Sequence, residues 1–338
     1  MTLSVQAYHH EDVFESLSFV WNDLLHRSAS DSLFLTVEFQ RIWWKHLGRG
    51  ELLVITVTDD DELIGIAPLF IEKDENDRRV LNFVGCVEVA DYLDLIALQG
   101  REREVTEALV GHLARLDDDA WHALDLCNVH QGSPTLDLLP ELAKAKGWDV
   151  DTELDDVCPI VDLPETWDEY LGMLDGKQRH EIRRRLRRAN AWQGMEWYIV
   201  DSEHDLEAEI DDFLHVMAVG DPEKQAFLTD SMDAFFRELA RTAFDAGWLQ
   251  LAFLTIDGQK AAAYFNFVYN NQVLAYNSGL DWESFPKVGA GTILTSYLIR
   301  HAIEEGREVF DFMRGDEEYK YRFGGEDIEV RRLTVERT

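Results

Sequence analysis

The chain has 338 residues, 46% of them hydrophobic, and its formal net charge is −34, from 66 acidic and 32 basic residues. This length favours two domains, and the hydrophobic content excludes an intrinsically disordered chain. So acidic a surface disfavours nucleic acid and anionic membranes as partners. The acid surplus, together with an excess of arginine over lysine, suggests a high-salt cytoplasm.

The three cysteines indicate a reducing compartment. Cys86, Cys127 and Cys158 are far apart, form no CxxC pair and are not accompanied by clustered histidines. We therefore predict reduced, buried thiols, no disulfide and no metal site. Residues 1–10 lack a basic region followed by an apolar run, and no stretch of about 18 apolar residues occurs. The sequence thus predicts a soluble, cytoplasmic protein without membrane insertion.

The first half alternates short strands and helices. Residues 3–8 predict a strand, residues 13–25 predict a helix, and a second helix begins after Thr36, a suitable N-cap. Strands are predicted at 52–58, 63–71, 80–84 and 92–98, followed by a helix at 101–116, a strand at 121–127, a helix at 133–146 and an extended segment at 148–160. A β-meander followed by helix, strand, helix and strand predicts a layered domain.

The second half repeats this order. Helices are predicted near residues 167–173, 176–192, 206–219 and 232–246, then strands at 248–256, 260–269 and 273–279, a glycine-bearing turn, a helix ended by Gly306 and a strand at 309–313. Residues 63–69 correspond to 260–267, and Asp125 corresponds to Asp311. We therefore predict an α/β (layered α+β) fold with tandem domains, residues 1–160 and 161–338, each a mixed, mostly antiparallel sheet flanked by helices.

The turn before the late helix is a candidate ligand site. Glycines there let the backbone approach a ligand, and the helix start aims N–H groups and the positive end of its dipole at one point. Such a point suits a phosphate or pyrophosphate, although glycines before a helix also make plain turns. We assign cofactor binding to Lys287, Val288, Gly289, Ala290, Gly291 and Thr292. The first half has only Gly100 at this place, so a cofactor is expected once, in the C-terminal half.

Several segments, taken in order, resemble a known family. They are residues 34–44, 65–69 and 91–94, Lys177-Gln-Arg179 with Arg183-Arg184, and residues 276–281 and 311–320. The element order resembles that of GNAT acyltransferases. The whole chain resembles the two-domain acetyltransferase-like family associated with cellulose and exopolysaccharide biosynthesis, which is related to the FemABX peptidyltransferases. The resemblance implies that the glycine turn holds the pyrophosphate of acetyl-CoA or another acyl-CoA.

One position departs from the GNAT pattern. Arg or Gln commonly stands three residues before the first glycine of the turn, and here that residue is Pro286. The contact with the anion then falls to backbone N–H groups of residues 288–292, with Lys287 nearby.

An arginine-rich helix supplies candidate substrate contacts. Lys177, Arg179, Arg183 and Arg184 are assigned to phosphates or carboxylates in a cleft between the domains, since the arginine fork suits both. The alternative is a cationic helix paired with acidic neighbours. A transfer RNA backbone also fits these cations, although the net charge disfavours it.

Acid–base candidates lie near strand ends. Asp91 is assigned to orient or deprotonate an acceptor amine, and Tyr319 to protonate the leaving thiolate, with simple packing as the alternative for Tyr319. An acid in an apolar strand must be paired, hydrogen-bonded or functional, and for Asp311 and its counterpart Asp125 a structural role stays open. The segments of the resemblance complete the set of substrate-binding candidates: Tyr92, Asp94, Tyr276, Asp281, Asp311, Arg314 and Lys320.

Together these observations predict an acyltransferase that moves an acyl group from acyl-CoA to an amine or hydroxyl acceptor, such as a sugar or an exopolysaccharide or cell-envelope precursor. A bulged strand near residues 276–279 would supply hydrogen bonds to the thioester oxyanion. Two alternatives stay open. One is an aminoacyl-tRNA-dependent peptidyltransferase, and the other is a noncatalytic binding module of polysaccharide assembly.

Overall fold

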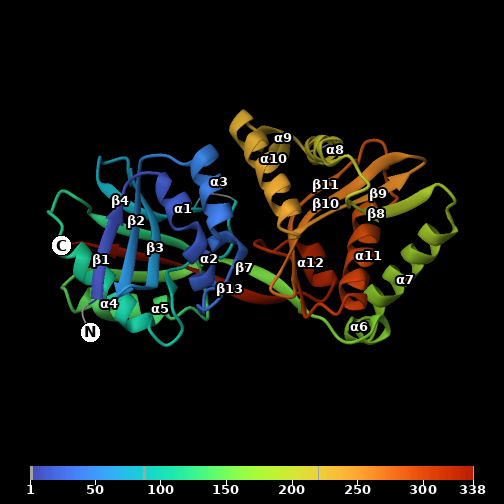
Figure 1. Cartoon of the computed structure of the whole chain (residues 1–338). Helices are drawn as coiled ribbons and strands as arrows, with labels where there is room; N and C mark the ends of the chain where they lie inside the picture. The colour runs from blue at the N-terminus through green and yellow to red at the C-terminus, as the bar shows by residue number, and fades with distance from the viewer. Residues whose placement is uncertain (1–2, 87–88, 220, 338) are drawn as a thin grey trace. The chain divides into compact units, whose positions relative to one another are not determined.

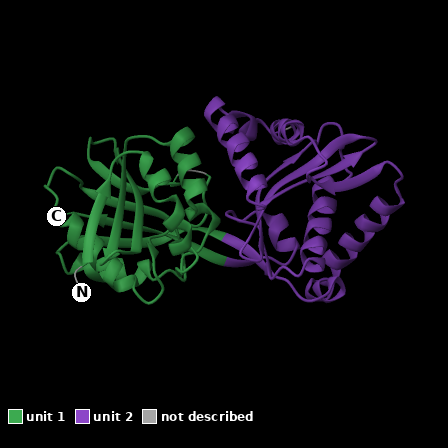
Figure 2. Ribbon diagram, in the orientation of Figure 1, with its two compact units in different colours: residues 1–157, 328–338 green, residues 158–327 purple. Residues whose placement is uncertain are grey.

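A computed structural model describes residues 3–86, 89–219 and 221–337 of the chain, which forms two compact units (Figure 2). Unit 1 comprises residues 1–157 and 328–338, and unit 2 comprises residues 158–327. The sequence-based division placed residues 328–338 in the second domain. They belong instead to unit 1, because β13 (Glu326–Glu336) pairs antiparallel with β6 (Ala123–His130). Unit 2 is therefore an insertion between two segments of unit 1.

Unit 1 is a mixed, mostly antiparallel sheet flanked by helices (Figure 1). The strand order is β1-β2-β3-β4-β6-β13-β7, with β5 paired to β3. Besides β6 and β13, its strands are β1 (Leu3–Tyr8), β2 (Glu51–Asp59), β3 (Glu62–Lys73), β4 (Arg79–Phe83), β5 (Ile96–Ala97) and β7 (Asp149–Asp162). Its helices are α1 (Asp12–Ser16), α2 (Ser18–Leu25), the 3-10 helix η1 (Leu33–Leu35), α3 (Val37–Leu47), α4 (Glu102–Leu113) and α5 (Thr135–Lys144).

Unit 2 is built in the same way. The last residues of β7, 160–162, pair with β12, and the order continues β12-β11-β10-β9-β8. Its strands are β8 (Met195–Ile199), β9 (Leu249–Ile256), β10 (Gln259–Tyr269), β11 (Gln272–Leu280) and β12 (Val309–Asp311). Its helices are α6 (Trp167–Met173), α7 (Gly176–Ala191), α8 (Leu206–Ala218), α9 (Pro222–Phe227), α10 (Asp230–Asp245), α11 (Ala290–Glu304) and α12 (Glu318–Arg322).

Both faces of the unit 2 sheet are covered by helices. Successive side chains of a strand point to opposite faces, and β10 shows this directly. Tyr264 belongs to the core that includes Leu186 of α7 and Leu298 of α11. The next residue, Phe265, contacts Phe213 of α8 and Phe236 of α10. Both faces of the sheet are therefore buried, which explains the nearly continuous apolar run in β10.

The two units share one arrangement of strands around a parallel pair. In unit 1, β4 is followed by the short β5, by α4 and then by β6, which lies parallel to β4. In unit 2, β11, α11 and β12 follow the same path. Asp125 lies opposite Asn82, and Asp311 lies opposite Leu274, so the two aspartates occupy equivalent places. The predicted fold of two similar tandem domains, each a mixed sheet flanked by helices, is confirmed.

Several elements differ from the prediction. The helix expected at 13–25 is split between α1 and α2. The strand expected at 92–98 shrinks to β5, and before it single bonds hold the loop, from the N–H of Leu93 to the carbonyl of Asn128 and from the N–H of Leu95 to the side chain of Asp94. The strands β8 and β13 and the short helices α9 and α12 were not predicted. Each missed element is short or highly charged, so its hydrophobic period is weak.

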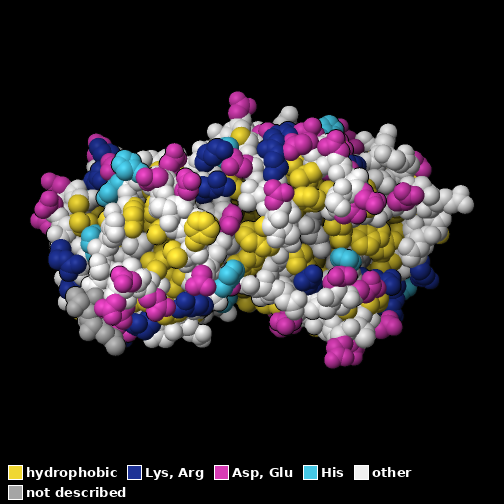
Figure 3. All heavy atoms as spheres, in the orientation of Figure 1, with side chains coloured by type: hydrophobic (Ala, Val, Ile, Leu, Met, Phe, Trp, Pro, Cys, Tyr) yellow, Lys and Arg dark blue, Asp and Glu magenta, His cyan; other side chains and the backbone are white. Residues whose placement is uncertain are grey.

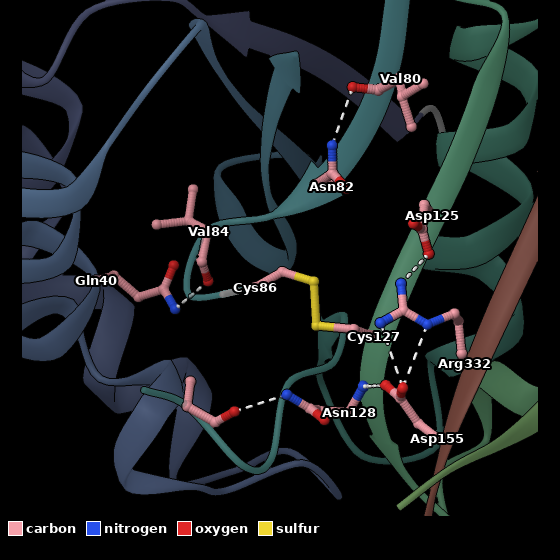
Figure 4. Close-up of a disulfide and its surroundings, with 11 residues drawn as sticks. Gln40, Val80, Asn82, Val84, Cys86, Asp125, Cys127, Asn128, Asp155 and Arg332 are labelled. Atoms are coloured by element: carbon pink, nitrogen blue, oxygen red, sulfur yellow. Dashed lines mark hydrogen bonds and ion pairs between the residues drawn. A yellow bond between two sulfur atoms is a disulfide. The ribbon is translucent and has the colours of Figure 1, made fainter. Parts of the chain in front are cut away.

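A disulfide joins Cys86 and Cys127, which are 41 residues apart in sequence (Figure 4). The prediction of reduced thiols was therefore wrong for these two cysteines. Cys86 follows β4 and Cys127 lies in β6, and these strands are neighbours in the sheet. The pairing of β4 with β6 brings the two sulfur atoms together, which the distance in sequence conceals. Cys158 is a buried thiol outside the disulfide.

The surface carries both signs of charge. Acidic side chains are spread over the face of each unit that Figure 3 shows, and Lys and Arg side chains lie among them. Many of the basic residues form exposed ion pairs, such as Arg103 with Glu141 at 2.7 Å. Among the described helices, none is both long and apolar enough to cross a bilayer.

Candidate functional site

The parallel strands β11 and β12 part after a short contact. They pair only from Gln272 opposite Val309 to Leu274 opposite Asp311. There β12 ends, whereas β11 continues to Leu280. In the described part of the chain, the edge of β11 beyond Leu274 therefore has no strand partner on this side. Ligand sites of α/β folds commonly lie at such carboxyl ends of strands.

A β-bulge begins this open edge. Phe265 pairs with Asn277 and Phe267 pairs with Leu274, so Ala275 and Tyr276 together lie opposite Asn266. A bulge interrupts the ladder and redirects backbone groups. The bulge expected near residues 276–279 is thus present, beginning at Ala275.

The ring of Tyr276 is half-buried in an aromatic group. It lies 5.1 Å from the ring of Phe267 and 6.1 Å from that of Phe236, between centroids. This packing holds the bulged part of β11 against α10.

The connection from β11 to α11 is a strained turn. Lys287 has φ 69° and Gly289 has φ 76°, both in the left-handed region that favours glycine. Oδ1 of Asp281 accepts the N–H of Ser284 at 2.9 Å, so this aspartate shapes the turn itself. The N-cap of α11 is Gly289, which offers no capping side chain. Helix geometry leaves the N–H groups of residues 290–292 without intrahelical acceptors.

Arg185 of α7 lies against this turn. Its Nη1 donates to the carbonyl oxygen of Val288 at 3.1 Å, and its Nε donates to Glu181 at 2.7 Å. A β-carbon placed on Gly289 would come within 1.6 Å of Arg185 Nη1. A guanidinium therefore stands beside the start of α11, where Pro286 provides no donor.

The sequence analysis assigned Arg184 and overlooked Arg185. A signal was present, because Arg185 is three residues after Ile182 and four before Ala189, and both are buried. The helical period thus places Arg185 at the border of the apolar stripe that packs on α11.

The other cations of α7 lie on the outer part of the helix. Arg184 donates to Glu181 at 2.8 and 2.6 Å, and this contact is the main cause that lowers the pKa of Glu181 to about 2. Arg183 lies 3.8 Å from Asp168, and both side chains are exposed. Lys177 is exposed and Arg179 is half-buried. Arg183 and Arg184 therefore have acidic neighbours, as the alternative interpretation of α7 as a cationic helix paired with acidic residues expects.

Tyr319 of α12 lies close to Tyr264 of β10, because each phenol affects the pKa of the other. The hydroxyl of Tyr264 lies 2.8 Å from Oγ1 of Thr295, and Oγ1 of Thr295 donates to the carbonyl oxygen of Gly291 at 2.8 Å. Tyr264 pairs with Ser278, beyond the point where β12 ends. The phenol of Tyr319 thus reaches the sheet at the open part of β11.

The phenol of Tyr319 is neutral at ordinary pH. Burial raises its pKa well above the usual value, and Tyr264 and Glu317 add to the effect. The residue as a whole keeps 36% of its surface exposed, so its side chain borders solvent. Burial also raises the pKa of Tyr264.

Lys320 holds the loop after β12. Its Nζ donates to the carbonyl oxygens of Met313, Arg314 and Gly315 at 2.9, 2.8 and 3.0 Å, and lies 2.8 Å from Oε2 of Glu317. An ammonium group has three donors, and the side chain is only 2% exposed. The assignment of Lys320 to substrate is therefore corrected, because its protons are used within the protein.

Asp311, the last residue of β12, and Arg314 also contribute to this loop. Oδ1 of the buried Asp311 accepts the N–H of Met313 at 2.7 Å, which favours the structural interpretation of Asp311. Its counterpart Asp125 is paired with Arg332 at 2.7 Å (Figure 4). Arg314 is half-buried, and its carbonyl oxygen is bound by Lys320.

The remaining candidates belong to unit 1. Asp94 is buried and accepts hydrogen bonds from the hydroxyls of Ser30, Ser133 and Thr135 at 2.8, 2.5 and 2.5 Å, and from the N–H of Leu95 at 2.8 Å. Burial raises its pKa, against the effect of these bonds. The assignment of Asp94 to substrate is corrected, since both oxygens are occupied in holding this loop.

Asp91 and Tyr92 lie in the same loop of unit 1. Asp91 is buried, and Tyr92 is half-buried with its ring edge-on to His130 at 5.9 Å between centroids. The glycine turn and Tyr319 belong to unit 2.

Lys224 of α9 is a further residue that the sequence analysis missed. Its Nζ donates to the carbonyl oxygen of Ser278 on the open part of β11. Burial lowers the pKa of Lys224, whereas Asp221 and Glu317 oppose the shift. Since α9 itself was not predicted, no pattern in the sequence pointed to this contact.

The arrangement is suited to an anion. Backbone N–H groups, a helix dipole and the guanidinium of Arg185 meet at the turn before α11. Within the described ranges, no three His, Cys, Asp or Glu side chains form a group that could hold a metal ion.

The part of the chain that contains the candidate site matches a known protein family. Residues 176–321 match the model of the acetyltransferase (GNAT) domain. The matched residues, 176–321, include α7, the glycine turn, α11 and Tyr319, which are the elements that make the site. The predicted relation to the GNAT superfamily is confirmed.

Solved structures share the fold of the chain. FemX has a TM-score of 0.68 at 12% identity, over 97% of this chain and 96% of FemX. A protein of unknown function from Bacteroides thetaiotaomicron has a TM-score of 0.58 at 11% identity, over 95% and 97% of the two chains. L-PGS from Bacillus licheniformis has a TM-score of 0.57 at 12% identity, over 94% and 90%. Comparison with curated proteins gave no match.

Proposed function

We propose that the GNAT domain binds an acyl-CoA at residues 287–292 and transfers its acyl group to an amine or hydroxyl acceptor. The observation that carries this proposal is the open N-terminus of α11, with Arg185 beside it, next to the unpaired edge of β11. Acetyl-CoA is the expected donor. A sugar or another precursor of exopolysaccharide or cell envelope is the expected acceptor class.

The contacts with the diphosphate come from main chain and one side chain. The N–H groups of residues 290–292 point out of the helix start, and the dipole of α11 adds to their attraction for an anion. Arg185 supplies the cationic fork that position 286 lacks. Lys287 is exposed on the same turn. Main chain and Arg185 together replace the side-chain donor of the usual GNAT pattern.

The equivalent helix of unit 1 is unsuited to an anion. Its first turn contains Glu102 and Glu104, and the N–H of Gly100 is already bonded to Oε1 of Glu102 at 2.9 Å. Acidic side chains at this place repel a phosphate. We therefore expect each chain to bind one acyl-CoA.

The open edge of β11 provides the place for the reaction. Beyond Leu274 this edge has no strand partner among the described residues, although the carbonyl oxygen of Ser278 is bound by Lys224. The bulge that begins at Ala275 is the proposed source of an N–H donor to the thioester oxyanion. Tyr319 lies at the same level of the sheet, and its neutral phenol is the proposed contact with the reacting groups. The exposed cations of α7 remain proposed contacts of the acceptor, and Asp91 remains the proposed acid–base residue of unit 1.

An aminoacyl-tRNA-dependent peptidyl transfer is the second candidate. It is supported by the likeness of fold to FemX and by the exposed Lys177 and Arg183. The net charge of −34 argues against binding an RNA backbone. Saturable binding of transfer RNA with a steep dependence on salt would favour this candidate over the first.

Calorimetric titration with CoA and acetyl-CoA tests the proposal. We expect saturable binding at one site, and loss of binding in Gly291→Arg, because the new side chain crowds the first turn of α11, where a β-carbon would already lie 3.0 Å from Leu280. Glu304→Arg is the matched control, since it adds the same side chain at the exposed end of the same helix. Unchanged affinity in Gly291→Arg, with a cooperative melting transition retained, would refute the site. Binding of oligosaccharide without any binding of CoA would favour the noncatalytic module.

A further inference from the structure

We infer that Lys224 and Asn277 close the unpaired edge of β11 in the free protein, and that an acyl-CoA displaces both side chains when it binds there. This inference rests on the proposed function and concerns the regulation of the same site. It adds a second requirement to the anion site at the start of α11, because the edge of β11 has to be released by α9. The two side chains therefore lower the affinity of the protein for the donor.

The backbone of Ser278 shows which way this part of the edge faces. Ser278 lies opposite Tyr264 of β10. Its N–H donates to Oδ1 of Asn277 at 2.8 Å, and its carbonyl oxygen accepts from Nζ of Lys224. In an antiparallel pair, both backbone polar groups of one residue point to the same side of the strand. Since both are bonded to side chains, they face away from β10, on the side where β12 has ended.

The two side chains take the place of a neighbouring strand. A strand would offer one acceptor and one donor to the backbone of Ser278, and here Asn277 provides the acceptor and Lys224 the donor. An edge that lacks such partners tends to bind other chains, and a lysine is a common protection against this. Neither backbone group of Ser278 is free for a ligand while these two bonds are intact.

Gly279 brings Lys224 within reach of this edge. A β-carbon on Gly279 would come within 2.5 Å of the backbone nitrogen of Met217, near the end of α8. The glycine therefore lets α8 pack directly on β11, and α9 follows with Lys224 in its first turn. Oδ1 of Asp221 caps α9 and accepts the N–H groups of Glu223 and Lys224 at 3.0 and 3.1 Å. The backbone of Lys224 is thus fixed beside the edge of β11.

The side chain of Lys224 can leave the edge without any movement of the strands. It is bound there through Nζ alone, at the end of a flexible four-carbon stem. The pantetheine arm of CoA contains amide groups, which can donate to the carbonyl oxygen of Ser278 and accept its N–H. Binding then exchanges one set of hydrogen bonds for another, so the net gain is smaller than at an edge that is already free.

Calorimetric titration of Lys224→Met with CoA tests the inference. Methionine cannot donate to Ser278, so the Kd for CoA should fall roughly tenfold, which corresponds to one hydrogen bond from a charged group. The loss of a positive charge acts in the opposite direction, because CoA is an anion. Lys146→Met is the matched control, since it removes the same charge from an exposed position in unit 1 and should leave the Kd nearly unchanged.

The adenosine bisphosphate fragment of CoA locates the effect. This fragment carries phosphate groups but lacks the pantetheine arm. Its Kd should be the same for the wild type and for Lys224→Met. A fall equal to that for CoA would show that the substitution acts on the anion site, and would overturn the inference.

Asn277→Ala covers the case in which Lys224→Met does not fold, and thermal melting checks both variants. It frees the N–H of Ser278, so the Kd for CoA should again fall. An unchanged or higher Kd in the folded variants would overturn the inference, whereas binding by the wild type would still support the proposed function. Binding of CoA by the variants alone would support the inference. If none of these proteins binds CoA, the proposed function fails and the inference fails with it.

Discussion

Nη1 of Arg185 occupies the place where the β-carbon of any residue other than glycine would stand at position 289. The glycine before α11 therefore serves a neighbouring side chain as well as the turn. It lets a guanidinium of α7 approach the main chain closely enough to bind the carbonyl of Val288. The cation of this site is thus positioned by a glycine more than one hundred residues away in sequence.

Gly289→Ala should weaken acyl-CoA binding. The added methyl group displaces Arg185, and a residue with a β-carbon at φ 76° costs about 1 kcal/mol of stability. We expect an increase of roughly tenfold in the Kd for CoA, measured by calorimetry. Gly306→Ala is the control, because Gly306 has φ 69° at the other end of α11 and a β-carbon added there would meet no atom of the described residues within 4 Å. Equal effects on binding in the two variants would contradict the role of Arg185.

Lys320→Met should destabilise unit 2. The change leaves one buried and two partly buried carbonyl oxygens without their charged donor, at a cost of about 3 kcal/mol. Urea denaturation measures the effect. Glu317→Gln is the control, since Glu317 is 58% exposed and its ion pair should contribute no more than about 1 kcal/mol. A loss in Lys320→Met as small as in the control would show that the loop is held by other contacts.

Asp94 should make the stability of unit 1 depend on pH in an unusual direction. Its pKa is raised by burial, so the folded protein binds a proton more readily than the unfolded chain. The stability from this group is fully present below the unfolded pKa and is lost as pH rises through the folded pKa. The asparagine of the Asp94→Asn variant does not titrate, so this variant is the reference for the wild type.

The free energy of unfolding of the wild type relative to Asp94→Asn should therefore increase from about pH 7 to about pH 4. Urea denaturation at several pH values measures this difference. A difference that is constant, or that grows toward neutral pH, would be inconsistent with a raised pKa.

Reduction of the disulfide should lower the stability of unit 1. A cross-link between residues 41 apart restricts the unfolded chain by about 4 kcal/mol in the chain-entropy model. Melting with and without a phosphine reductant measures the loss. The double variant Cys86→Ser and Cys127→Ser should melt at the same temperature under both conditions, whereas Cys158→Ala should keep the response to reductant. Three reactive thiols in the denatured, unreduced wild type would argue against the bond.

The regular elements of both units followed from the hydrophobic pattern. The meanders, α11 and the correspondence of Asp125 with Asp311 all rest on local periodicity and order. The glycine turn was also visible, because Gly289 and Gly291 are adjacent to a clear helix. Such features depend on residues that are neighbours in sequence.

The contacts that define the site could not be predicted from the sequence in this way. Arg185 reaches Val288, and Lys224 reaches Ser278, across long stretches of chain. Lys320 and Asp94 looked like ligand-binding charges, because their type and spacing do not reveal that internal carbonyls and hydroxyls already satisfy them. The disulfide was missed for the same reason, because its two cysteines meet only through the pairing of β4 with β6 in the sheet.

The pairing of β13 with β6 has a consequence for biosynthesis. The ribosome makes all of unit 2 before residues 328–336, which complete the sheet of unit 1. A nascent or truncated chain that lacks them leaves the edge of β6 with unpaired N–H and C=O groups, which attract other strands. Premature termination anywhere in the second unit should therefore yield an aggregation-prone first unit, and chaperones are expected to retain it until synthesis is finished.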